Sequence, residues 1–359
     1  MTGPSEQPGE VLHLSGSAFD RGRGQAAGAP ADEVRATLAA RLKTARDAGW
    51  FDAAARHYLD EQRAFAERNC ANAMAELAGI ADGFGIAEED LFEHLYLGTL
   101  KDLSRMSGGD HDGCSAWAVA DGPDGPLLAK NRDFSGRHAG IQRVFRHEGP
   151  DLNQGPMLCL GSLGAPGAYS SGMNAAGLAL ADTQVGVRSH ATGWLRYFLM
   201  TEILARAATV DEALALIRSV PHAGGGTLVL ADRSGAVATV ELGSASAAIE
   251  RAQLVCRTNH FTTTALAPET LSDQGSRIDG NSAGRRAVLD RELPGRRWDA
   301  AGAAALMARH DGEAPLCQHS AGGEAHTIAS AVYCCRPGLM YACLDNPCSG
   351  AWRRIPLVA

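Results

Sequence analysis

The first third of the chain has the residue pattern of helices. Residues 31–83 are rich in Ala, Leu, Glu and Arg with few residues that break a helix, and a second helical stretch, IAEEDLFEHLYLGTL, follows the glycines at 83 and 85. The polar residues 1–9, with Gly and Pro among them, predict a loose tail. A glycine-rich polar stretch, RMSGGDHDG, then ends at Gly113. Loops of this composition are usually exposed and easily cleaved, so we expect an accessible loop here.

After Gly113 the pattern changes to short strands that return on themselves. CSAWAVAD and PLLAKNRDF are joined by the turn signal Gly-Pro-Asp-Gly, and three more pairs of strand-like segments follow, the last of them IASAVYCCRPGLMYACLD. Helical stretches separate these pairs at about 192–220, 282–292 and 298–309. Consecutive hairpins with helices between them predict an α+β fold, in which antiparallel sheets are covered by helices, rather than a doubly wound parallel sheet.

Composition and charge narrow the class of protein. The chain of 359 residues is long enough to bury a sizeable core, and 45% hydrophobic and 21% charged residues are typical of a soluble globular protein. A net charge of -8 argues against nucleic acid or an anionic membrane as the main partner. No apolar run is long enough to span a bilayer, and the N-terminus lacks the pattern of a secretion signal. We therefore expect a cytoplasmic protein.

The nine cysteines are the first candidates for chemistry. They contain no CxxC pair and no Cys/His spacing of a zinc site, so we expect no metal, and a reducing compartment predicts free thiols. Most of them, such as Cys159 and Cys343, lie in apolar segments and are expected to be small buried hydrophobic residues. Cys114 differs because it follows the glycine-rich loop and opens a strand.

Two designs can activate the Cys114 thiol, of which only about 3% is ionised at pH 7 when its pKa is unperturbed. A papain-like design needs a histidine base, but the segment DGCSAW opens a strand where a papain-type cysteine opens a helix. In the second design the residue is N-terminal and its own α-amine, with a pKa near 8, is the base. That design requires cleavage after Gly113, whose lack of a side chain tolerates the strained backbone of the reaction.

Seven segments, taken in order, resemble the acyl-CoA:6-aminopenicillanate (isopenicillin N) acyltransferase family of autoproteolytic cysteine enzymes. DGCSAWAV with GPLLAKNRDF resembles the start of that family's mature chain. Before it lie the resembling segments LSGSAFDRGRGQAAG and AMAELAGIADGFGIAEEDLF, and after it SGMNAAGLALADT, RTNHF, NSAGRRAVL and HTIASAVY with DNPC. More distant relatives of the family are penicillin V acylases and bile-salt hydrolases.

The resemblance implies a fold, a processing step and an activity. The fold is the four-layer αββα sandwich of the N-terminal-nucleophile (Ntn) hydrolases, with two antiparallel sheets flanked by helices. Residues 1–113 are expected to form a helical pro-segment, or α chain, and residues 114–359 the catalytic core, or β chain. After self-cleavage between Gly113 and Cys114 the two fragments are expected to stay together as one integrated domain. The chain has no phosphate-binding glycine motif, and we expect no cofactor.

The resemblance also assigns roles to individual side chains. Asp133, in NRDF, matches the aspartate that orients and polarises the amine and thiol of the nucleophile. Asn259, in RTNHF, matches the asparagine that helps bind the oxyanion of the tetrahedral intermediate. Arg285, in NSAGRRAVL, best matches an arginine beside the nucleophile, although Arg286 is the alternative one residue on. A fixed cation there favours the thiolate.

The sequence departs from the bile-salt hydrolases at two places. They carry an arginine where this chain has Lys130, and their second oxyanion asparagine falls near Thr183 or Gln184, where this chain has no Asn. A backbone N–H or one of those two side chains is then the donor, and activity toward bile salts is not expected. His111 and Asp112 flank the expected cleavage site, where two interpretations stay open: they assist processing by proton transfer, or they are ordinary polar residues of an exposed loop.

The expected reaction passes through an acyl-thioester on Cys114. Water then gives an amide hydrolase, and an amine acceptor gives an N-acyltransferase. The expected partner is a small-molecule amide, N-acylated or aminoacylated, or an acyl-CoA; within the family both penicillin-type acyl transfer and hydrolysis of β-alanyl amides are compatible with the resemblance. The alternatives are an unprocessed cysteine hydrolase with a histidine base and a catalytically silent binding homologue.

Overall fold

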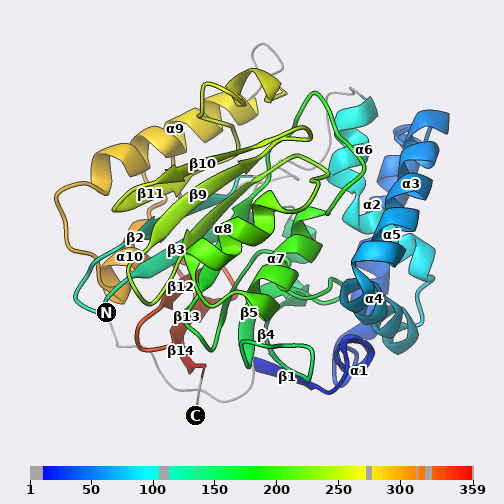
Figure 1. Cartoon of the computed structure of the whole chain (residues 1–359), viewed down its shortest axis with the longest axis horizontal. Helices are drawn as coiled ribbons and strands as arrows, with labels where there is room; N and C mark the ends of the chain where they lie inside the picture. The colour runs from blue at the N-terminus through cyan, green and yellow to red at the C-terminus, as the bar shows by residue number, and fades with distance from the viewer. Residues whose placement is uncertain are drawn as a thin grey trace.

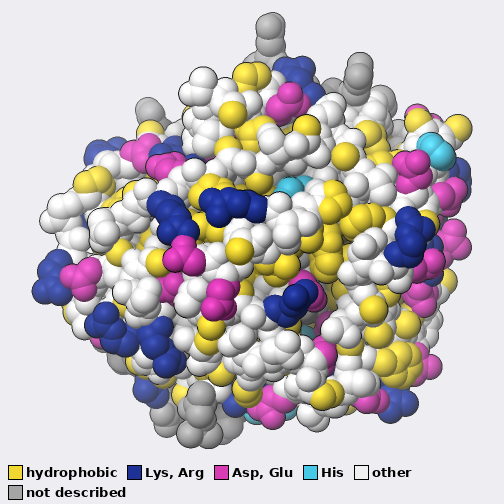
Figure 2. Space-filling view, in the orientation of Figure 1, with side chains coloured by type: hydrophobic (Ala, Val, Ile, Leu, Met, Phe, Trp, Pro, Cys, Tyr) yellow, Lys and Arg dark blue, Asp and Glu magenta, His cyan; other side chains and the backbone are white. Residues whose placement is uncertain are grey.

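The computed structural model describes residues 11–104, 113–134, 136–271, 277–312, 314–319 and 326–357. The expected loose tail at 1–9 lies outside these ranges. Among the described residues, no helix has both the length and the apolar character to cross a membrane. On the face shown in Figure 2, basic and acidic side chains are interspersed, without a field of one sign.

An eight-stranded sheet and a six-stranded sheet form the centre of the molecule (Figure 1). The eight-stranded sheet has the order β1-β4-β5-β6-β7-β8-β9-β10, and the six-stranded sheet the order β11-β2-β3-β12-β13-β14. The strands of the first sheet are β1 (Val11–Ser15), β4 (Gln142–Glu148), β5 (Met157–Ser162), β6 (Ser171–Asn174), β7 (Ala179–Thr183), β8 (Thr227–Ala231), β9 (Val237–Leu242) and β10 (Ala247–Arg251). Those of the second are β2 (Ser115–Val119), β3 (Leu127–Phe134), β11 (Leu254–Arg257), β12 (His326–Cys334), β13 (Leu339–Cys343) and β14 (Arg353–Pro356).

The two sheets pack face to face through small and branched side chains. Each strand sends alternate residues to opposite faces, so Ala116 and Ala118 of β2 meet Ala179 and Ala181 of β7 in one buried cluster. The residues between them in β2, such as Trp117, face the other way and pack against helices. Strands with both faces covered explain why β2, β3 and β8 are buried along almost their whole length.

Helices cover the outer face of each sheet. The helices α7 (Arg196–Arg206) and α8 (Val210–Arg218) pack on the eight-stranded sheet, with Leu214 and Ile217 of α8 in the same cluster as Leu228 of β8. The helices α9 (Arg277–Glu292) and α10 (Ala300–Met307) cover the six-stranded sheet. Two 3-10 turns, η1 (Gly136–Ile141) and η2 (Ala267–Glu269), lie in the connections. The four-layer αββα sandwich, an α+β fold, is therefore confirmed.

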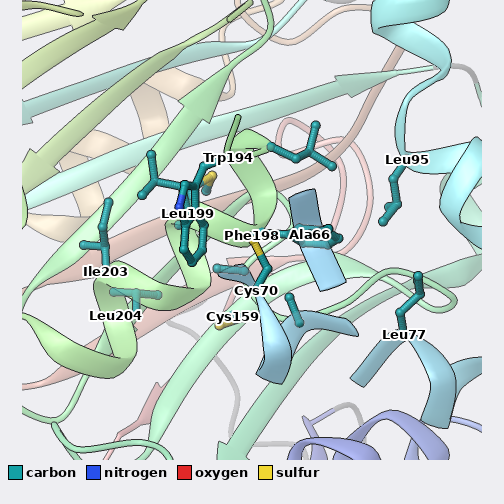
Figure 3. Close-up of a cluster of buried hydrophobic side chains, with 14 of the residues drawn as sticks. Ala66, Cys70, Leu77, Leu95, Cys159, Trp194, Phe198, Leu199, Ile203 and Leu204 are labelled. Atoms are coloured by element: carbon teal, nitrogen blue, oxygen red, sulfur yellow. The ribbon is translucent and has the colours of Figure 1, made fainter. Parts of the chain in front are cut away.

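The helices upstream of Gly113 form a block beside the sandwich (Figure 1). They are α1 (Ala18–Gly24), α2 (Ala31–Asp47), α3 (Ala53–Asn69), α4 (Ala71–Phe84), α5 (Glu88–Leu95) and α6 (Leu97–Ser104). Their apolar faces share one core with α7 and the eight-stranded sheet: Ala66 and Cys70 lie next to Phe198, Leu199 and Cys159 (Figure 3). The helical block therefore depends on the sandwich to bury its apolar surface.

The helices α1 and α4 cross at very short range, because glycines line the contact. A Cβ at Gly22 would lie 2.0 Å from the backbone oxygen of Glu76, and one at Gly79 would lie 2.0 Å from that of Phe19. Only glycine permits such an approach of two backbones. Gly22 and Gly79 therefore serve the packing of the two helices.

Strand β1 adds two details to the expected architecture. The first sheet is not purely antiparallel, since β1 pairs with β4 in parallel, with Val11 beside Val144 and Ser15 beside Glu148. For the same reason the segment before Gly113 is not purely helical: it contributes an edge strand. Parallel pairing requires a long connection between the strands, and here the connection runs through the six upstream helices and through β2 and β3 of the other sheet.

Candidate active site

The bond between Gly113 and Cys114 lies in buried surroundings immediately before β2. Gly113 is buried, and only 7% of Cys114 is exposed. The expectation of an exposed loop is therefore wrong at the proposed cleavage site itself. The preceding residues 105–112, with His111 and Asp112, lie outside the described residues.

Buried side-chain donors hold both carbonyls around this bond. The Gln318 Nε2 atom donates to the Gly113 carbonyl oxygen at 3.0 Å. The Arg285 Nη1 atom donates to the Cys114 carbonyl oxygen at 2.5 Å. The Cys114 Sγ atom lies 3.7 Å from the backbone oxygen of Asp133, so the thiol sits at the end of the neighbouring strand β3.

The Asp133 carboxylate is buried and held from two sides. Thr327 Oγ1 donates to its Oδ1 atom, and Gln318 Nε2 lies 3.1 Å from its Oδ2 atom. Burial raises the pKa of Asp133 to about 6, against the opposing effect of Arg285 and of the two hydrogen bonds. Gln318 thus connects Asp133 to the carbonyl of Gly113. The Asp133 carboxylate is therefore linked to the bond between Gly113 and Cys114 through Gln318. The Cys114 thiol contacts the backbone oxygen of Asp133.

Arg285, on α9, is fully buried and points toward Cys114. Besides the Cys114 carbonyl it donates to Ser115 Oγ at 2.9 Å, to Asn259 Oδ1 at 2.8 Å and to Asn281 Oδ1 at 2.6 Å. Asn281 lies one helical turn before it, which fixes the guanidinium from its own helix. Arg286 points elsewhere and pairs with Asp290 at 2.8 Å. Of the two arginines, Arg285 is the one beside Cys114.

Asn259 follows β11 and links Arg285 to the opposite sheet. Its Oδ1 atom accepts from Arg285, and its Nδ2 atom donates to the Gln184 carbonyl at 2.9 Å. An amide nitrogen carries two donor hydrogens, so the bond to Gln184 uses one of them. Its backbone N–H is held by Ser282 Oγ at 2.8 Å. Asn259 is thus rigidly placed within the same cluster.

Lys130 lies on the face of β3 that meets the eight-stranded sheet. It is fully buried, its Nζ atom donates to the carbonyl of Asp182, and it lies 3.6 Å from the Asp182 carboxylate. Asp182 also pairs with Arg196 at 2.9 Å, and Arg196 donates to Gln184 Oε1 at 2.5 Å. The Gln184 side chain is therefore engaged with Arg196.

Thr183 lies between Asp182 and Gln184 and is fully buried. Among the described residues, its Oγ1 atom has no hydrogen-bond partner. It falls in the alternation of Ala179 and Ala181, whose side chains face the six-stranded sheet. Thr183 thus offers a buried, unsatisfied hydroxyl near the Lys130 side of the site.

The sequence interpretation missed three side chains of this cluster. Asn281 carries a readable signal, since it lies four residues before Arg285 on a helix. Thr327 pairs in register with Asp133 across β12 and β3, which the two hairpins do not reveal on their own. Gln318 lies in an irregular segment after α10, and no motif marks it.

The remaining cysteines fit their expected structural role. Seven of the other eight are buried and Cys348 is partly exposed. Burial raises the pKa of the Cys70, Cys256 and Cys334 thiols to about 12, which keeps them protonated. The expectation that most are inert hydrophobic residues is thus supported by their surroundings.

The comparisons with known proteins show the family. The model of the family described as acyl-coenzyme A:6-aminopenicillanic acid acyl-transferase matches residues 120–349, well over half of the chain. The chain belongs to this family, and is an enzyme of the amide hydrolase or acyltransferase type. A search of curated protein sequences gave no match.

Two of the solved structures similar to this chain are of a bile acid hydrolase, and a third is of a penicillin V acylase. A mutant of the conjugated bile acid hydrolase from Clostridium perfringens is 14% identical with a TM-score of 0.41, covering 67% of this chain and 96% of the other. A second variant of that enzyme is 14% identical with a TM-score of 0.42, covering 68% of this chain and 97% of the other. Penicillin V acylase from Agrobacterium tumefaciens is 14% identical with a TM-score of 0.29, covering 65% of this chain and 75% of the other.

Proposed function

We propose that this chain is a precursor that cleaves itself between Gly113 and Cys114 and thereby becomes an N-terminal-cysteine amide hydrolase or N-acyltransferase. The observation that carries the proposal is the fixation of the two carbonyls around that bond, one by Gln318 and one by Arg285. A strand that served only packing would not need two buried side-chain donors on consecutive carbonyls. Such donors suit a peptide bond that is to be attacked.

In the cleavage step the Cys114 sulfur adds to the Gly113 carbonyl carbon. The negative charge develops on the oxygen to which Gln318 donates. Collapse breaks the C–N bond, and the leaving nitrogen takes up the proton that the thiol gave up, so that it becomes the α-amine of Cys114. Water then hydrolyses the Gly113 thioester, which releases a carboxyl group at Gly113 and the free thiol.

In the mature enzyme the new α-amine is the base for its own thiol. Asp133 and Arg285 carry opposite charges beside this amine. In the proposal Asp133 orients the amine, and Arg285 favours the thiolate. The thiolate attacks a substrate carbonyl, the amine returns the proton to the leaving nitrogen, and an acyl-thioester remains. Asn259 and the Thr183 hydroxyl are the proposed donors to the substrate oxyanion.

The two fragments remain associated in this proposal. Strand β1 pairs with β4 across the cleavage point, and the upstream helices share a core with α7. Separation would expose that shared apolar surface to water. The active form is thus one domain of two chains, residues 1–113 and 114–359.

The proposed substrate is a small N-acylated or aminoacylated molecule, or an acyl-CoA with an amine acceptor. Lys130 and Asp182 place one positive and one negative charge beside the site. The absence of an asparagine at 183 or 184 argues against bile salts, since the Gln184 side chain is already engaged with Arg196.

The first test is the size of the purified protein and of two variants. The wild-type chain is expected to give fragments 1–113 and 114–359 on a denaturing gel, with Cys at the new N-terminus by mass spectrometry. Cys114→Ala is expected to remain a single chain of 37.5 kDa. Cys256→Ala, another buried thiol, is the control and is expected to cleave normally. An intact chain in both the wild type and Cys114→Ala would contradict the proposal and favour the unprocessed or silent alternatives.

The second test decides the fate of the acyl-thioester. The processed enzyme is incubated with acyl-CoA plus an amine, and separately with small amides that include penicillins and β-alanyl amides, and the products are identified by mass spectrometry. An acylated amine identifies a transferase. Acyl turnover with water alone excludes the transferase and leaves the hydrolase.

A further inference from the structure

Three side chains with metal-binding atoms converge at one end of the six-stranded sheet, outside the catalytic cluster. They are His310 after α10, His319 further along the same connection, and Cys348 in the turn between β13 and β14. One ligand atom from each lies within 4.8 Å of both others. The His319 Nε2 atom and the Cys348 Sγ atom are only 3.0 Å apart.

These separations approach those of a tetrahedral zinc site. Zinc bonds of about 2.3 Å to sulfur and about 2.0–2.1 Å to nitrogen place neighbouring ligand atoms about 3.6 Å apart. The distance from His319 to Cys348 lies slightly below that value, and the limit of 4.8 Å for the set lies slightly above it. Small rotations of the exposed His310 and His319 side chains and of the partly exposed Cys348 side chain would bring all three atoms to the required spacing.

Second contacts orient one of the rings. The His310 Nδ1 atom lies 3.3 Å from the backbone oxygen of Ala308, which can only accept, so Nδ1 carries the hydrogen and Nε2 keeps its lone pair. A ligating histidine typically donates its other N–H to a carbonyl in this way. The His310 and His319 rings meet edge to face, with centroids 5.5 Å apart.

The backbone around the cluster is tied down before any ion arrives. The Cys317 N–H donates to the Arg309 carbonyl at 2.7 Å, which holds the two parts of the connection together. The turn that carries Cys348 is anchored by Asn346, whose Nδ2 atom donates to the Thr327 carbonyl at 2.6 Å. The cluster is thus built on fixed segments.

We propose that His310, His319 and Cys348 bind one Zn²⁺ ion or a similar borderline divalent cation, with the fourth position open to solvent. Imidazole and thiolate are the ligands that such cations prefer. On binding, the Cys348 thiol releases its proton to solvent and the thiolate donates to the ion. Cys317 lies beneath the site, with its Sγ atom 3.4 Å from His319 Nε2, but it is outside the three-ligand set.

The sequence predicts no such site, because its ligands do not follow a short motif. His310 and His319 are separated by a connection that folds back on itself, and Cys348 lies 29 residues beyond His319. The proposal is also independent of self-cleavage, since none of the three ligands is a residue of the catalytic cluster.

The test measures metal binding to the full chain carrying Cys114→Ala, which removes the nucleophilic thiol as a competing ligand. After treatment with a chelator and equilibrium dialysis against Zn²⁺, we expect one bound equivalent per chain. His310→Ala and Cys348→Ser are each expected to weaken binding at least about tenfold. His57→Ala, an exposed histidine on α3 with 76% of its side chain accessible, is the matched control and is expected to bind normally.

Cobalt gives a second readout, which reports the thiolate directly. With Co²⁺ we expect an intense near-ultraviolet thiolate-to-metal band that disappears in Cys348→Ser and persists in His57→Ala. Equal Zn²⁺ binding by all variants, no retained Zn²⁺, or a cobalt spectrum without that band would overturn the proposal. So would native thiol titration showing Cys348 oxidised in a disulfide with Cys317. Cys348→Ser is set aside if it lowers the melting temperature of the metal-free chain. The Zn²⁺ affinity of His310→Ala, which changes an exposed ring, then tests the proposal by itself.

Discussion

The two sides of the candidate site differ in how their buried polar atoms are paired. Around the bond between Gly113 and Cys114, the Asp133 carboxylate, the Gln318 amide and the Arg285 guanidinium hold one another or the chain itself. On the side of the eight-stranded sheet, the Thr183 hydroxyl is buried and, within the described residues, has no partner. The first side is a closed network, and the second contains an unsatisfied group.

This difference suggests that the partner of the first side is the Gly113 carbonyl, which is part of the folded chain, and that the partner of the second side is a substrate, which binds later. A buried polar atom without a partner costs about 1–3 kcal/mol. The closed network is satisfied because the scissile carbonyl belongs to the folded chain. The Thr183 hydroxyl is explained if its partner is the oxygen of an arriving substrate. We therefore propose that the first side serves chiefly the proposed self-cleavage and the second side turnover.

Arg285→Met is expected to have the largest effect, because it opens the closed network at its centre. The side chain is fully buried, and its removal strands the acceptors at Cys114, Asn259 and Asn281. We expect loss of self-cleavage and a decrease of about 3–5 kcal/mol in the free energy of unfolding. Denaturing gels and urea titration measure the two effects.

Arg286→Met is the matched control for that experiment. Arg286 is the next residue on the same helix but pairs with Asp290 at the surface. A partly exposed pair of this kind contributes about 0–1 kcal/mol, and cleavage should continue. An equal or greater effect of Arg286→Met would reverse the assignment of the two arginines.

Gln318→Met removes the donor to the scissile carbonyl while keeping the length of the side chain. We expect self-cleavage to slow by about 10²–10³, as for the loss of one oxyanion donor. The rate is followed by gel after synthesis in a cell-free system. Gln25→Met is the control: Gln25 is equally buried and bonds the backbone of Ala165 and Gly164, far from Cys114. If both variants cleave at the same rate, Gln318 has no specific role.

Thr183→Val tests the other side of the comparison. Self-cleavage should proceed at the wild-type rate, whereas turnover of an amide substrate should fall by about 10². The stability should be unchanged or slightly higher, since a buried unsatisfied hydroxyl is replaced by a methyl group. Thr227 is the cross-strand partner of Thr183, and its buried hydroxyl also has no hydrogen-bond partner within the described residues. Thr227→Val is therefore the control that shows whether the loss of any such hydroxyl lowers turnover. Slower self-cleavage in Thr183→Val would contradict the separation of the two sides, because Thr183 would then contribute to both reactions.

The pH dependence of cleavage is expected to be the smallest effect. Burial raises the pKa of Asp133 to about 6, so the carboxyl is protonated below that pH and ionised above it. If the ionised form is needed, the cleavage rate falls about tenfold per pH unit below pH 6. Infrared spectra of Cys114→Ala should show a carboxyl band that titrates near pH 6 and is missing in the additional variant Asp133→Asn. A midpoint below pH 4.5 would contradict this value.

Much of the fold could be predicted because its signals are local. The turns after β2, β6 and β8 contain Gly with Asp or Asn, and each joins two strands of the pattern expected for a hairpin. Strand β1 could not be predicted in its place, since its partner β4 lies more than a hundred residues away. Five residues between a polar tail and a glycine also give too weak a signal.

The candidate site divides in the same way. Cys114, Asp133, Asn259 and Arg285 lie in segments with recognisable neighbours, and the structure brings them together; their roles remain predictions. Gln318 belongs to an irregular connection, and the position of its side chain depends on where α10 ends and how β12 begins. The polar loop before Cys114 predicted exposure, but the strand that follows draws Gly113 into the interior.

Strand β1 also changes the molecularity of folding. In the precursor, β1 and β4 belong to one chain, and their pairing is an intramolecular event. If the chain is cleaved as proposed, the same edge of the sheet becomes an interface between two polypeptides, so that recovery from complete unfolding is second order and depends on concentration. The processed enzyme therefore depends on how slowly it comes apart, whereas its precursor can regain the sheet at any dilution.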